Sequence, residues 1–371
     1  MKVPFFDYTQ IYEQDFPIYE KALDSVLKRA DFILRDDLVQ FEANLAKFVG
    51  VNHCVGVANG TDAIWLGLRA AGIGEGDEVI LPSHTYVATA DAVWAVGGTP
   101  VLVDIGDDHS ISPDAVEEAI SDRTTAIIPV NLNGRAAPLP EICRIATKRN
   151  LVVIEDNAQG LGAKIDGKSA GTFGLLASLS FYPAKTLGGL GDGGGVITND
   201  ADVAKKIKLL RSHGRDEQNE VVEWGFNSRL DNLQAAVLDA KLMVLDEHIA
   251  KRRHIADLYL EKLADVDEIR LPQHQGSSEG LFVSYQNFEI EAQYRDELKE
   301  YLAEHGVGTI IQWGGKGVHE FGLPGVKTKD LSNTERIIKS MLLLPMNHYL
   351  RDEQIDHVSS TIRSFYAQKS K

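Results

Sequence analysis

Two residues in the middle of the chain have side chains that could together carry out covalent chemistry on a ring-shaped ligand. Asp156 closes the apolar segment 151–156, and Lys185 follows a second apolar segment at 177–182. A carboxylate at the end of an apolar strand is unfavourable to bury without a cationic partner, and a protonated ring nitrogen would be such a partner. A desolvated lysine titrates near neutral pH and can attack an aldehyde. The pair therefore fits a cofactor that carries both a basic ring nitrogen and an aldehyde.

Two other segments could complete such a site. The segment 59–62, Asn-Gly-Thr-Asp, directly precedes a predicted helix, and the free amides and hydroxyl at a helix start suit a phosphate. The segment 82–86 follows a predicted strand, so the ring of Tyr86 could cover a flat cofactor and His84 could act in catalysis. The sequence thus offers a candidate for each end of a phosphorylated aromatic ligand.

Each of these residues also has a plainer role when it is taken alone. Asp156 and the segment 59–62 could be helix caps, since Asp and Asn favour that position. Lys185 could be a surface lysine, Tyr86 a core aromatic residue and His84 a structural histidine. The argument for a site depends on all of them occurring together in one domain.

The glycine-rich segment 188–195 bears on the class of ligand. Glycine permits close approach of the backbone to a ligand. Lys185 precedes these glycines, whereas the lysine of a GxxxxGK[ST] phosphate loop follows its glycines. A GxGxxG motif after an early strand, with an acidic residue about 20 positions further on, is also lacking. A Rossmann-type dehydrogenase is therefore the weakest of the alternatives.

The elements that must position these residues alternate between about 50 and 200. The predicted strands are 78–81, 99–105, 125–131, 151–156, 177–182 and 195–198. The predicted helices are 62–71, 85–96, 114–120, 140–149 and 201–212. Continuous apolar strands separated by helices favour a parallel sheet covered on both faces. Ligands of such sheets bind at the carboxyl ends of the strands, where the candidate residues stand.

The pattern changes after about residue 245. The predicted elements from 231 onward are a long helix at 231–259, strands at 280–290 and 309–313, and helices at 293–305, 333–342 and 351–367. We therefore predict a large ligand-binding α/β domain at 1–245, including the N-terminal segment, and a smaller α+β domain at 246–371.

Composition excludes several classes of function. The formal net charge is −16 at pH 7, and no cluster of Lys and Arg forms the basic patch that nucleic-acid binding needs. The two cysteines form no CxxC pair, so neither a disulfide framework nor a metal site is expected. No apolar run is long enough for a membrane span, and the N-terminus shows no signal-peptide pattern. We expect a cytoplasmic protein that acts on small molecules.

The order of these motifs resembles the DegT/DnrJ/EryC1/StrS aminotransferase family, which are fold type I enzymes dependent on pyridoxal 5'-phosphate. The resemblance covers nearly the whole chain. It is carried by FILRDDLVQFE, NGTDA, PSHTYVATA, IIPVNLNGRA, VIEDNAQGLGA, SFYPAKTLGGLGDGGGVITND, GFNSRLDNLQAAVL and LLLPMNHYLRDEQID. It implies a large domain with a mostly parallel seven-stranded sheet between helices, followed by a smaller C-terminal α+β domain.

The resemblance also implies a role for individual residues. Lys185 would form the Schiff base with the cofactor, and Asp156 would pair with its pyridine nitrogen. Gln159 would contact the ring hydroxyl, and Tyr86 would stack on the ring. The phosphate would be held by Gly60, Thr61, Asp62 and Ser180. Asn227 would reach the phosphate of a neighbouring subunit, which implies a homodimer with shared active sites.

The implied reaction transfers an amino group from L-glutamate to a nucleotide-linked 3- or 4-keto-6-deoxy sugar. Such a product would enter O-antigen, glycan or antibiotic sugar biosynthesis. Some family members are dehydratases with histidine in place of the lysine, so the presence of Lys185 favours transamination. The alternatives are an aminotransferase acting on a non-nucleotide keto substrate such as a cyclitol, and a non-catalytic protein that binds pyridoxal phosphate.

Two features leave the identity of the substrate open. Asn131 stands where the family often has His, in a segment that lies near the sugar in relatives, and the segment 311–319 fits no particular sugar. The nucleotide's diphosphate needs local cations, because the overall charge is unfavourable. The candidates that flank the predicted site are Arg211, His213, Arg215 and Arg229, whose plainer role is surface charge or a dimer salt bridge.

Overall fold

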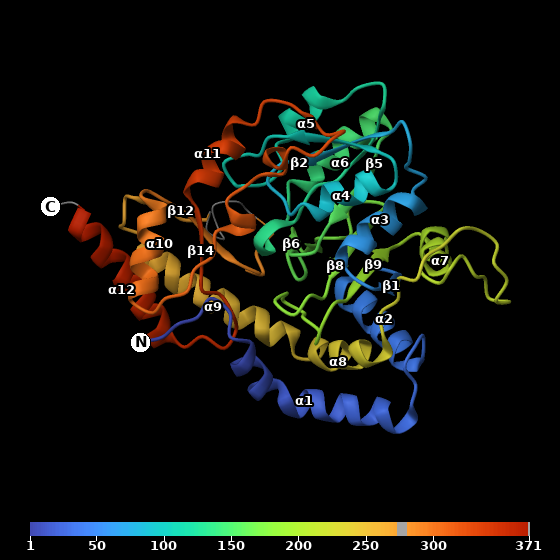
Figure 1. The fold of residues 1–371 in the computed structure, drawn as a ribbon, viewed down its shortest axis with the longest axis horizontal. Coiled ribbons are helices and arrows are strands. Elements are labelled where there is room, and N and C mark those ends of the chain that lie inside the picture. Colours follow the sequence, from blue (N-terminus) through green and yellow to red (C-terminus); the bar gives the residue numbers. More distant parts are fainter. Residues whose placement is uncertain (273–279, 370–371) are drawn as a thin grey trace.

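A mixed eight-stranded sheet forms the centre of the fold (Figure 1). The structure is a computed structural model that describes residues 1–272 and 280–369. The strand order across the sheet is β1-β9-β8-β5-β4-β2-β3-β13. In chain order these strands are β1 (His53–Val57), β2 (Glu78–Pro82), β3 (Thr99–Val103), β4 (Thr124–Ile127), β5 (Val152–Asp156), β8 (Leu176–Ser180), β9 (Gly194–Thr198) and β13 (Lys327–Thr328).

The predicted seven-stranded, mostly parallel sheet is confirmed, and an eighth strand extends it. Strands β3, β2, β4, β5 and β8 pair in parallel, whereas β9 runs antiparallel to both β8 and β1. The eighth strand is β13, which pairs with β3 in parallel through Lys327 and Val101. Because β1 and β8 both oppose β9, all strands except β9 end at the same edge of the sheet.

Helices cover both faces of the sheet. Along β2, Val79 and Leu81 are buried with α3 and α4 on one face, and Ile80 is buried with α5 and α6 on the other. Burial on both faces explains why the strands are apolar at every position. The covering helices are α2 (Asp36–Val49), α3 (Gly60–Ala70), α4 (Ala88–Ala95), α5 (Pro113–Ala119), α6 (Leu139–Arg149), α7 (Ala201–Leu210) and α8 (Asn232–Leu242).

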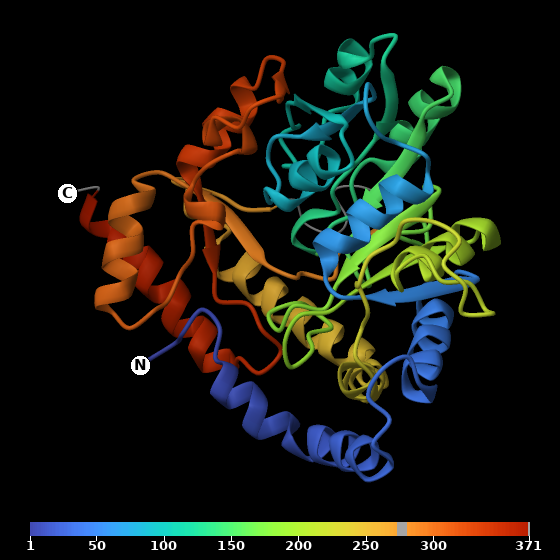
Figure 2. The same cartoon turned by 45° about the vertical axis from the view of Figure 1, so that its right-hand side comes forward.

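The N-terminal helix α1 (Tyr8–Arg29) runs beside α8 along the outer side of the molecule (Figure 2). Asp7 caps its first turn by accepting a hydrogen bond from the Gln10 amide at 3.0 Å. Pro17 lies inside α1 and cannot donate a backbone hydrogen bond there. The sequence patterns did not lead us to predict this helix.

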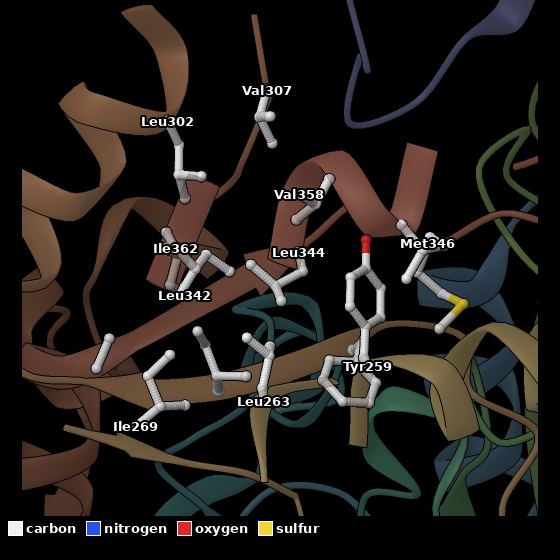
Figure 3. Close-up of a cluster of buried hydrophobic side chains, with 14 of the residues drawn as sticks. Tyr259, Leu263, Ile269, Leu302, Val307, Leu342, Leu344, Met346, Val358 and Ile362 are labelled. Carbon is white, nitrogen blue, oxygen red and sulfur yellow. The ribbon is translucent and has the colours of Figure 1, made fainter. Parts of the chain in front are cut away.

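The C-terminal part has a core of its own (Figure 3). Buried side chains from its helices meet across a three-stranded antiparallel sheet of order β10-β12-β14. Tyr259 and Leu344 are two members of this core. The elements here are α9 (Leu245–Leu263), β10 (Ile269–Arg270), β12 (Phe288–Ala292), α10 (Arg295–Glu304), α11 (Ser332–Ser340), β14 (Met341–Leu344) and α12 (Asp352–Lys369).

We propose a domain boundary close to residue 245, where one helix ends and the next begins. The chain crosses this boundary again at two points. Val3 is buried in the C-terminal core and forms a bridge with Val307, so the first residues pack there rather than with the large sheet. Strand β13 lies on the other side of the boundary, in the large sheet. A third, small sheet also joins both parts, through β6 (Lys164–Ile165), β7 (Lys168–Ser169) and β11 (Leu281–Phe282).

Three predicted elements were wrong in detail. The single strand at 280–290 is two strands, β11 and β12, which lie in different sheets. The single helix at 231–259 is broken between α8 and α9 at Met243 and Val244. Leu242 and Leu245 both face the same apolar cluster, so the periodicity continues through the break and does not reveal it. The strand predicted at 309–313 is reduced to one bridge, because a 3-10 turn at Gln312–Gly314 comes directly after it.

Within residues 1–272 and 280–369, no helix has both the length and the apolar character needed to cross a lipid bilayer.

Candidate functional site

A cavity of about 660 Å³ opens at the carboxyl edge of the large sheet. This volume lies within the range of roughly 300–1,000 Å³ that is typical of small-molecule sites. The turns after β1, β2, β5 and β8 all contribute to it. Eight of the nine site residues predicted from the sequence line the cavity: Gly60, Thr61, Asp62, Tyr86, Asp156, Gln159, Ser180 and Lys185.

Lys185 projects its amine into this cavity rather than from a flexible surface loop. Its amide donates to the Tyr182 carbonyl at 2.8 Å, which closes a tight turn after β8. Burial lowers the pKa of the Lys185 ammonium to about 8, and the nearby Asp156 carboxylate partly opposes this shift. A substantial fraction of the amine is therefore neutral, and nucleophilic, near neutral pH.

A residue from the C-terminal part fixes the backbone on both sides of Lys185. The Gln286 side-chain oxygen accepts hydrogen bonds from the Thr186 amide at 2.6 Å and the Thr186 hydroxyl at 2.7 Å. Its side-chain nitrogen donates to the Ala184 carbonyl at 2.8 Å. Gln286 is buried, just before β12. Sequence reasoning missed it, because nothing in the spacing links residue 286 to residue 185.

Asp156 is held by hydrogen bonds at both carboxylate oxygens. Oδ2 accepts from the Thr89 hydroxyl on α4 at 2.8 Å, and Oδ1 accepts from the Ala158 amide at 3.1 Å. The second hydrogen bond closes a turn after β5. Asp156 therefore also caps the chain locally, but it caps a turn, because no helix begins there. The carboxylate is buried at the end of β5 and lines the cavity. A fixed, buried anion of this kind suits a cationic ring nitrogen.

The start of α3 forms the other end of the cavity. Asn59 caps this helix by accepting from the Asp62 amide at 2.8 Å, and the amides of the preceding two residues point out of the first turn without a helical partner. A Cβ on Gly60 would lie 2.9 Å from the Cβ of Ser180, so only glycine allows α3 to pack this closely on β8. Ser180 thereby places a hydroxyl beside the helix start, and the two together suit an anion.

The polar groups of Asp62 already have hydrogen-bond partners within the chain. Its carboxylate accepts from the Ser228 hydroxyl at 2.6 Å, and its amide is used by Asn59. It lines the cavity without offering a free donor there. A direct hold on phosphate by Asp62 therefore stays a prediction, with less support than the same role for Gly60 and Thr61.

Tyr86 and Gln159 have the freedom that their predicted roles need. Tyr86 has 57% of its surface exposed and lines the cavity, so it is no core aromatic residue. The Gln159 side-chain oxygen accepts from the Asn133 amide at 2.9 Å. The side-chain nitrogen of Gln159 remains to donate to an acceptor such as a ring hydroxyl or phenolate.

The lining residues that were not predicted include Thr89, Tyr182, Asp192 and Trp313. Tyr182 could have been found, because it ends the same predicted strand segment that precedes Lys185. Thr89 lies on α4, and only the fold brings it to Asp156. Trp313 adopts a left-handed backbone conformation with φ of 50°, which is rare for a bulky residue and is often kept at functional sites.

Asn227 lies outside this cavity. It lines an adjoining groove on the other side of Thr61 and Asp62, together with Trp65 and Phe226. Its backbone pairs with Ser212, in the loop between α7 and α8. The structure of one chain thus does not bring Asn227 to the other eight predicted residues.

Asn131, which we expected near a substrate, is fully buried. Its side-chain nitrogen donates to Glu155 and Asn157, both at 3.0 Å, and its oxygen accepts from the Ala137 amide at 2.9 Å. Burial raises the pKa of Glu155, and hydrogen bonds from Gly174 and Asn131 partly offset that shift. Asn131 therefore supports β5 from behind and does not face the cavity.

Two other candidates are also structural. Arg211 is buried and pairs with Glu42 at 2.5 Å and with the Gly56 carbonyl at 2.7 Å, so its charge is used within the chain. His84 is buried under Trp313, at a ring-centroid distance of 5.1 Å, and does not line the cavity. A direct catalytic role for His84 is not supported by this placement.

Comparison with known proteins places this geometry in context. The model of the DegT/DnrJ/EryC1/StrS aminotransferase family matches residues 18–363. A protein of Acidithiobacillus ferrooxidans named UDP-N-acetyl-3-dehydro-alpha-D-glucosamine 3-aminotransferase is 40% identical over 92% of each chain. A protein of Geobacillus stearothermophilus named pleiotropic regulatory protein is 39% identical over 99% of each chain. The crystal structure of S. venezuelae DesV in complex with a ketimine intermediate matches 98% of each chain with a TM-score of 0.93 and 36% identity.

Proposed function

This chain belongs to the DegT/DnrJ/EryC1/StrS aminotransferase family, and from that premise we propose that it is a pyridoxal-phosphate enzyme that aminates a nucleotide-linked keto sugar. The observation that carries the proposal is the convergence of Lys185 and Asp156 in one cavity whose far end is a helix start. A nucleophilic amine, an anion and a phosphate site are the three features that this cofactor requires.

The residues present fit pyridoxal phosphate. The start of α3 with Gly60, Thr61 and Ser180 would hold the phosphate, and Tyr86 and Gln159 would contact the ring. When bound, the cofactor supplies an electron-withdrawing ring that stabilises a carbanion and a carbon that carries the amino group between donor and acceptor. Asp156 would keep the ring nitrogen protonated, because the Thr89 hydroxyl and the Ala158 amide hold its carboxylate in place at the ring end of the cavity.

Lys185 would serve first as the covalent attachment point and then as the acid–base group. As a neutral amine it can take the proton from the α-carbon of the amino donor, and as an ammonium it can return a proton to the acceptor side. The hydrogen bonds from Gln286 fix the backbone on both sides of Lys185, which would restrict the position of its amine for both tasks. In the second half-reaction the same steps run in reverse on the keto sugar.

The proposed substrate is a nucleoside diphosphate carrying a 3- or 4-keto-6-deoxy sugar, with L-glutamate as the amino donor. The name of the A. ferrooxidans relative, a 3-aminotransferase for a UDP-linked 3-dehydro sugar, supports a nucleotide-linked keto sugar, although the sugar in that name is not a 6-deoxy sugar. The product would feed amino-sugar biosynthesis for O-antigens, glycans or antibiotics. A panel of keto sugars on UDP, GDP and dTDP, with cyclitol ketones as competitors, tests the class. Turnover of a cyclitol with no turnover of any nucleotide sugar would reject it.

A regulatory, non-catalytic role is the second candidate, and the name of the G. stearothermophilus relative favours it. A protein that only binds the cofactor has no need to lower the pKa of Lys185 or to hold its backbone on both sides. Amino-group transfer from glutamate to the bound cofactor in a single turnover separates the two candidates.

We further propose a homodimer in which Asn227 of each chain completes the site of the other. Its place in a groove outside the main cavity suits such a role, and exposed aromatic residues such as Trp94 and Phe226 line the same groove. Mixing a Lys185→Ala chain with an Asn227→Asp chain would then restore activity, since each hybrid holds one intact site. If the mixture shows only the average activity of the two parent proteins, the proposal of shared active sites would be rejected.

The low pKa of Lys185 predicts how the cofactor-free protein takes up pyridoxal phosphate. The neutral amine is the attacking form, so the rate should rise with pH and level off above the pKa of about 8. Between pH 7 and 8 the rise should be about fivefold, as the neutral fraction of such a group increases. Stopped-flow absorbance measures this rate. A rate that keeps rising tenfold per unit to pH 10 would indicate an ordinary lysine.

Replacement of Gln286 by leucine should lower kcat about 10- to 100-fold and leave the KM for glutamate nearly unchanged, because a misplacement of about 1 Å can have an effect of this size. The side chain does not line the cavity and would act through Lys185, so the rate of cofactor uptake should fall in parallel. Gln293→Leu, an exposed position seven residues further on, is the matched control. Loss of thermal stability with no change in either rate would show a purely structural role.

A further inference from the structure

Three side chains from distant parts of the chain converge behind Trp313. His84 follows β2, His109 follows β3, and Glu289 lies in β12 of the C-terminal part. The Glu289 Oε1 atom is 3.1 Å from His109 Nδ1 and 3.7 Å from His84 Nε2. One atom of each side chain lies within 4.8 Å of the other two.

These spacings match those of ligands around a tetrahedral zinc-type ion. Zinc bonds to imidazole nitrogen and carboxylate oxygen are about 2.0–2.2 Å long, which places neighbouring ligand atoms about 3.3–3.5 Å apart. The two measured separations, 3.1 and 3.7 Å, lie on either side of this range. An ion would thus need only a small adjustment of the side chains.

His84 gives a second, independent indication. The residue is 1% exposed, and both of its ring nitrogens lack a hydrogen-bond partner in the part of the chain that the structure describes. Buried polar side chains are nearly always paired. A cation between His84 and Glu289 would give the Nε2 lone pair the partner that it lacks.

The surroundings of the cluster also suit an ion. His109 Nε2 lies 3.1 Å from Glu291 Oε1, and a carboxylate on the second nitrogen is the usual outer partner of a metal-bound histidine. The side-chain nitrogen of Asn133 donates to the second oxygen of Glu289. A small adjoining cavity of about 70 Å³, lined by His109, Glu289 and Glu291, could admit the ion and a water as fourth ligand.

A second cluster in the chain lacks this favourable setting. Asp15, His248 and His348 also converge, but the Lys241 ammonium lies 3.6 Å from Asp15. Burial, together with the positive charge of Arg252, lowers the pKa of His348. A metal ion there would be repelled by both fixed cations, so this cluster serves as an internal control.

We propose that His84, His109 and Glu289 bind one divalent cation of the zinc class. The ion joins the carboxyl edge of the large sheet to β12 of the C-terminal part, and it braces Trp313, which lines the main cavity. This role is independent of the reaction proposed above. The competing state is the ion pair of a protonated His109 with Glu289 and Glu291, in which no metal is needed.

Cobalt(II) provides the direct test. The cofactor-loaded protein is treated with a chelator, desalted and titrated with cobalt chloride, and absorbance is followed between 500 and 650 nm. We expect one cobalt per chain with the intense band of a tetrahedral N/O site, and its displacement by zinc chloride. Absence of saturable binding to the wild type would overturn the proposal in favour of the ion pair.

Single substitutions test which side chains bind the ion. Glu289→Gln and His84→Gln should each weaken cobalt binding by about 100-fold or more, beyond the effect known for outer partners. His348→Gln in the control cluster should leave it unchanged. Circular dichroism shows whether each variant is folded. Thermal unfolding gives a second readout that does not depend on the metal's absorbance: zinc should raise the melting temperature of the wild type and of His348→Gln only. Equal binding by Glu289→Gln, or loss in His348→Gln, would reject the assignment.

Discussion

Replacing Lys185 by alanine should abolish amino-group transfer, with kcat reduced by about 10⁴-fold or more. An acid–base group alone contributes up to about 10⁴-fold, and Lys185 is the only cationic side chain among the described residues that line the main cavity. None of the other lining residues carries an amine that could take over the covalent attachment or the proton transfer. The cofactor should still bind, because the phosphate end and Asp156 are intact, but it should be released on dialysis.

The measurement is a single turnover with L-glutamate, followed by the visible absorbance of the bound cofactor. The variant should show the spectrum of the free aldehyde form, and glutamate should not convert the cofactor to its amine form. Lys205→Ala, on the exposed side of α7, is the matched control and should behave as wild type. Residual turnover within tenfold of wild type would mean that another group does the chemistry.

The second large effect is expected for Asp156→Asn, which keeps the shape of the side chain and removes its charge. We expect kcat to fall by about 10²- to 10³-fold, the size found for the loss of one preorganised electrostatic partner of a reacting group. The neutral amide no longer stabilises a protonated ring nitrogen, so the ring withdraws electrons less strongly. The affinity for the nucleotide sugar should change little, because Asp156 lies at the cofactor end.

A companion variant separates charge from geometry. Thr89→Val removes the hydrogen bond to Asp156 Oδ2 but leaves the carboxylate in place, and we expect a loss of only about tenfold. Rapid-quench measurement of each half-reaction shows where the defect lies. If the two variants lose activity equally, the hydrogen bond and not the charge would be the essential feature of this position.

Six of the eight strands of the large sheet could be predicted from the sequence, because two physical signals agree there. Segments such as 151–156 are apolar at every position, which indicates burial on both faces, and a polar residue then marks the end. Since parallel strands end at one edge, Asp156 and Ser180 had to lie near one another, whereas the strand before Gly60 was not predicted. Site residues such as Gln159 and Ser180 were identified only because the resemblance to the family implies them.

The residues that were missed depend on contacts across long distances in the chain. Gln286 reaches Lys185 from the C-terminal part, and Thr89 reaches Asp156 from a helix one layer away. Neither contact leaves a local pattern of spacing or charge. Asn131 and Arg211 show the converse error, since polar residues close to a site in sequence turned out to be hydrogen-bonded inside the framework.

Helix boundaries were the other source of error. The apolar residues at 238, 242, 245 and 249 keep a helical period through the break between α8 and α9, so periodicity predicts one helix. The segment 309–313 has the composition of a strand, but glycines at 314 and 315 with positive φ turn the chain away after a single bridge. The turn at these two glycines thus overrules the local preference for a strand.

The two crossings of the proposed domain boundary restrict the order in which the protein can mature on the ribosome. Residue 3 belongs to a core whose other members extend to residue 366, and the eighth strand of the large sheet begins only at residue 327. Domains generally fold as units while the chain emerges from the N-terminus. Here the earliest residues must wait for the latest ones, and the edge of the first sheet stays open until synthesis is nearly finished. Neither half can therefore reach its final form before the other has emerged.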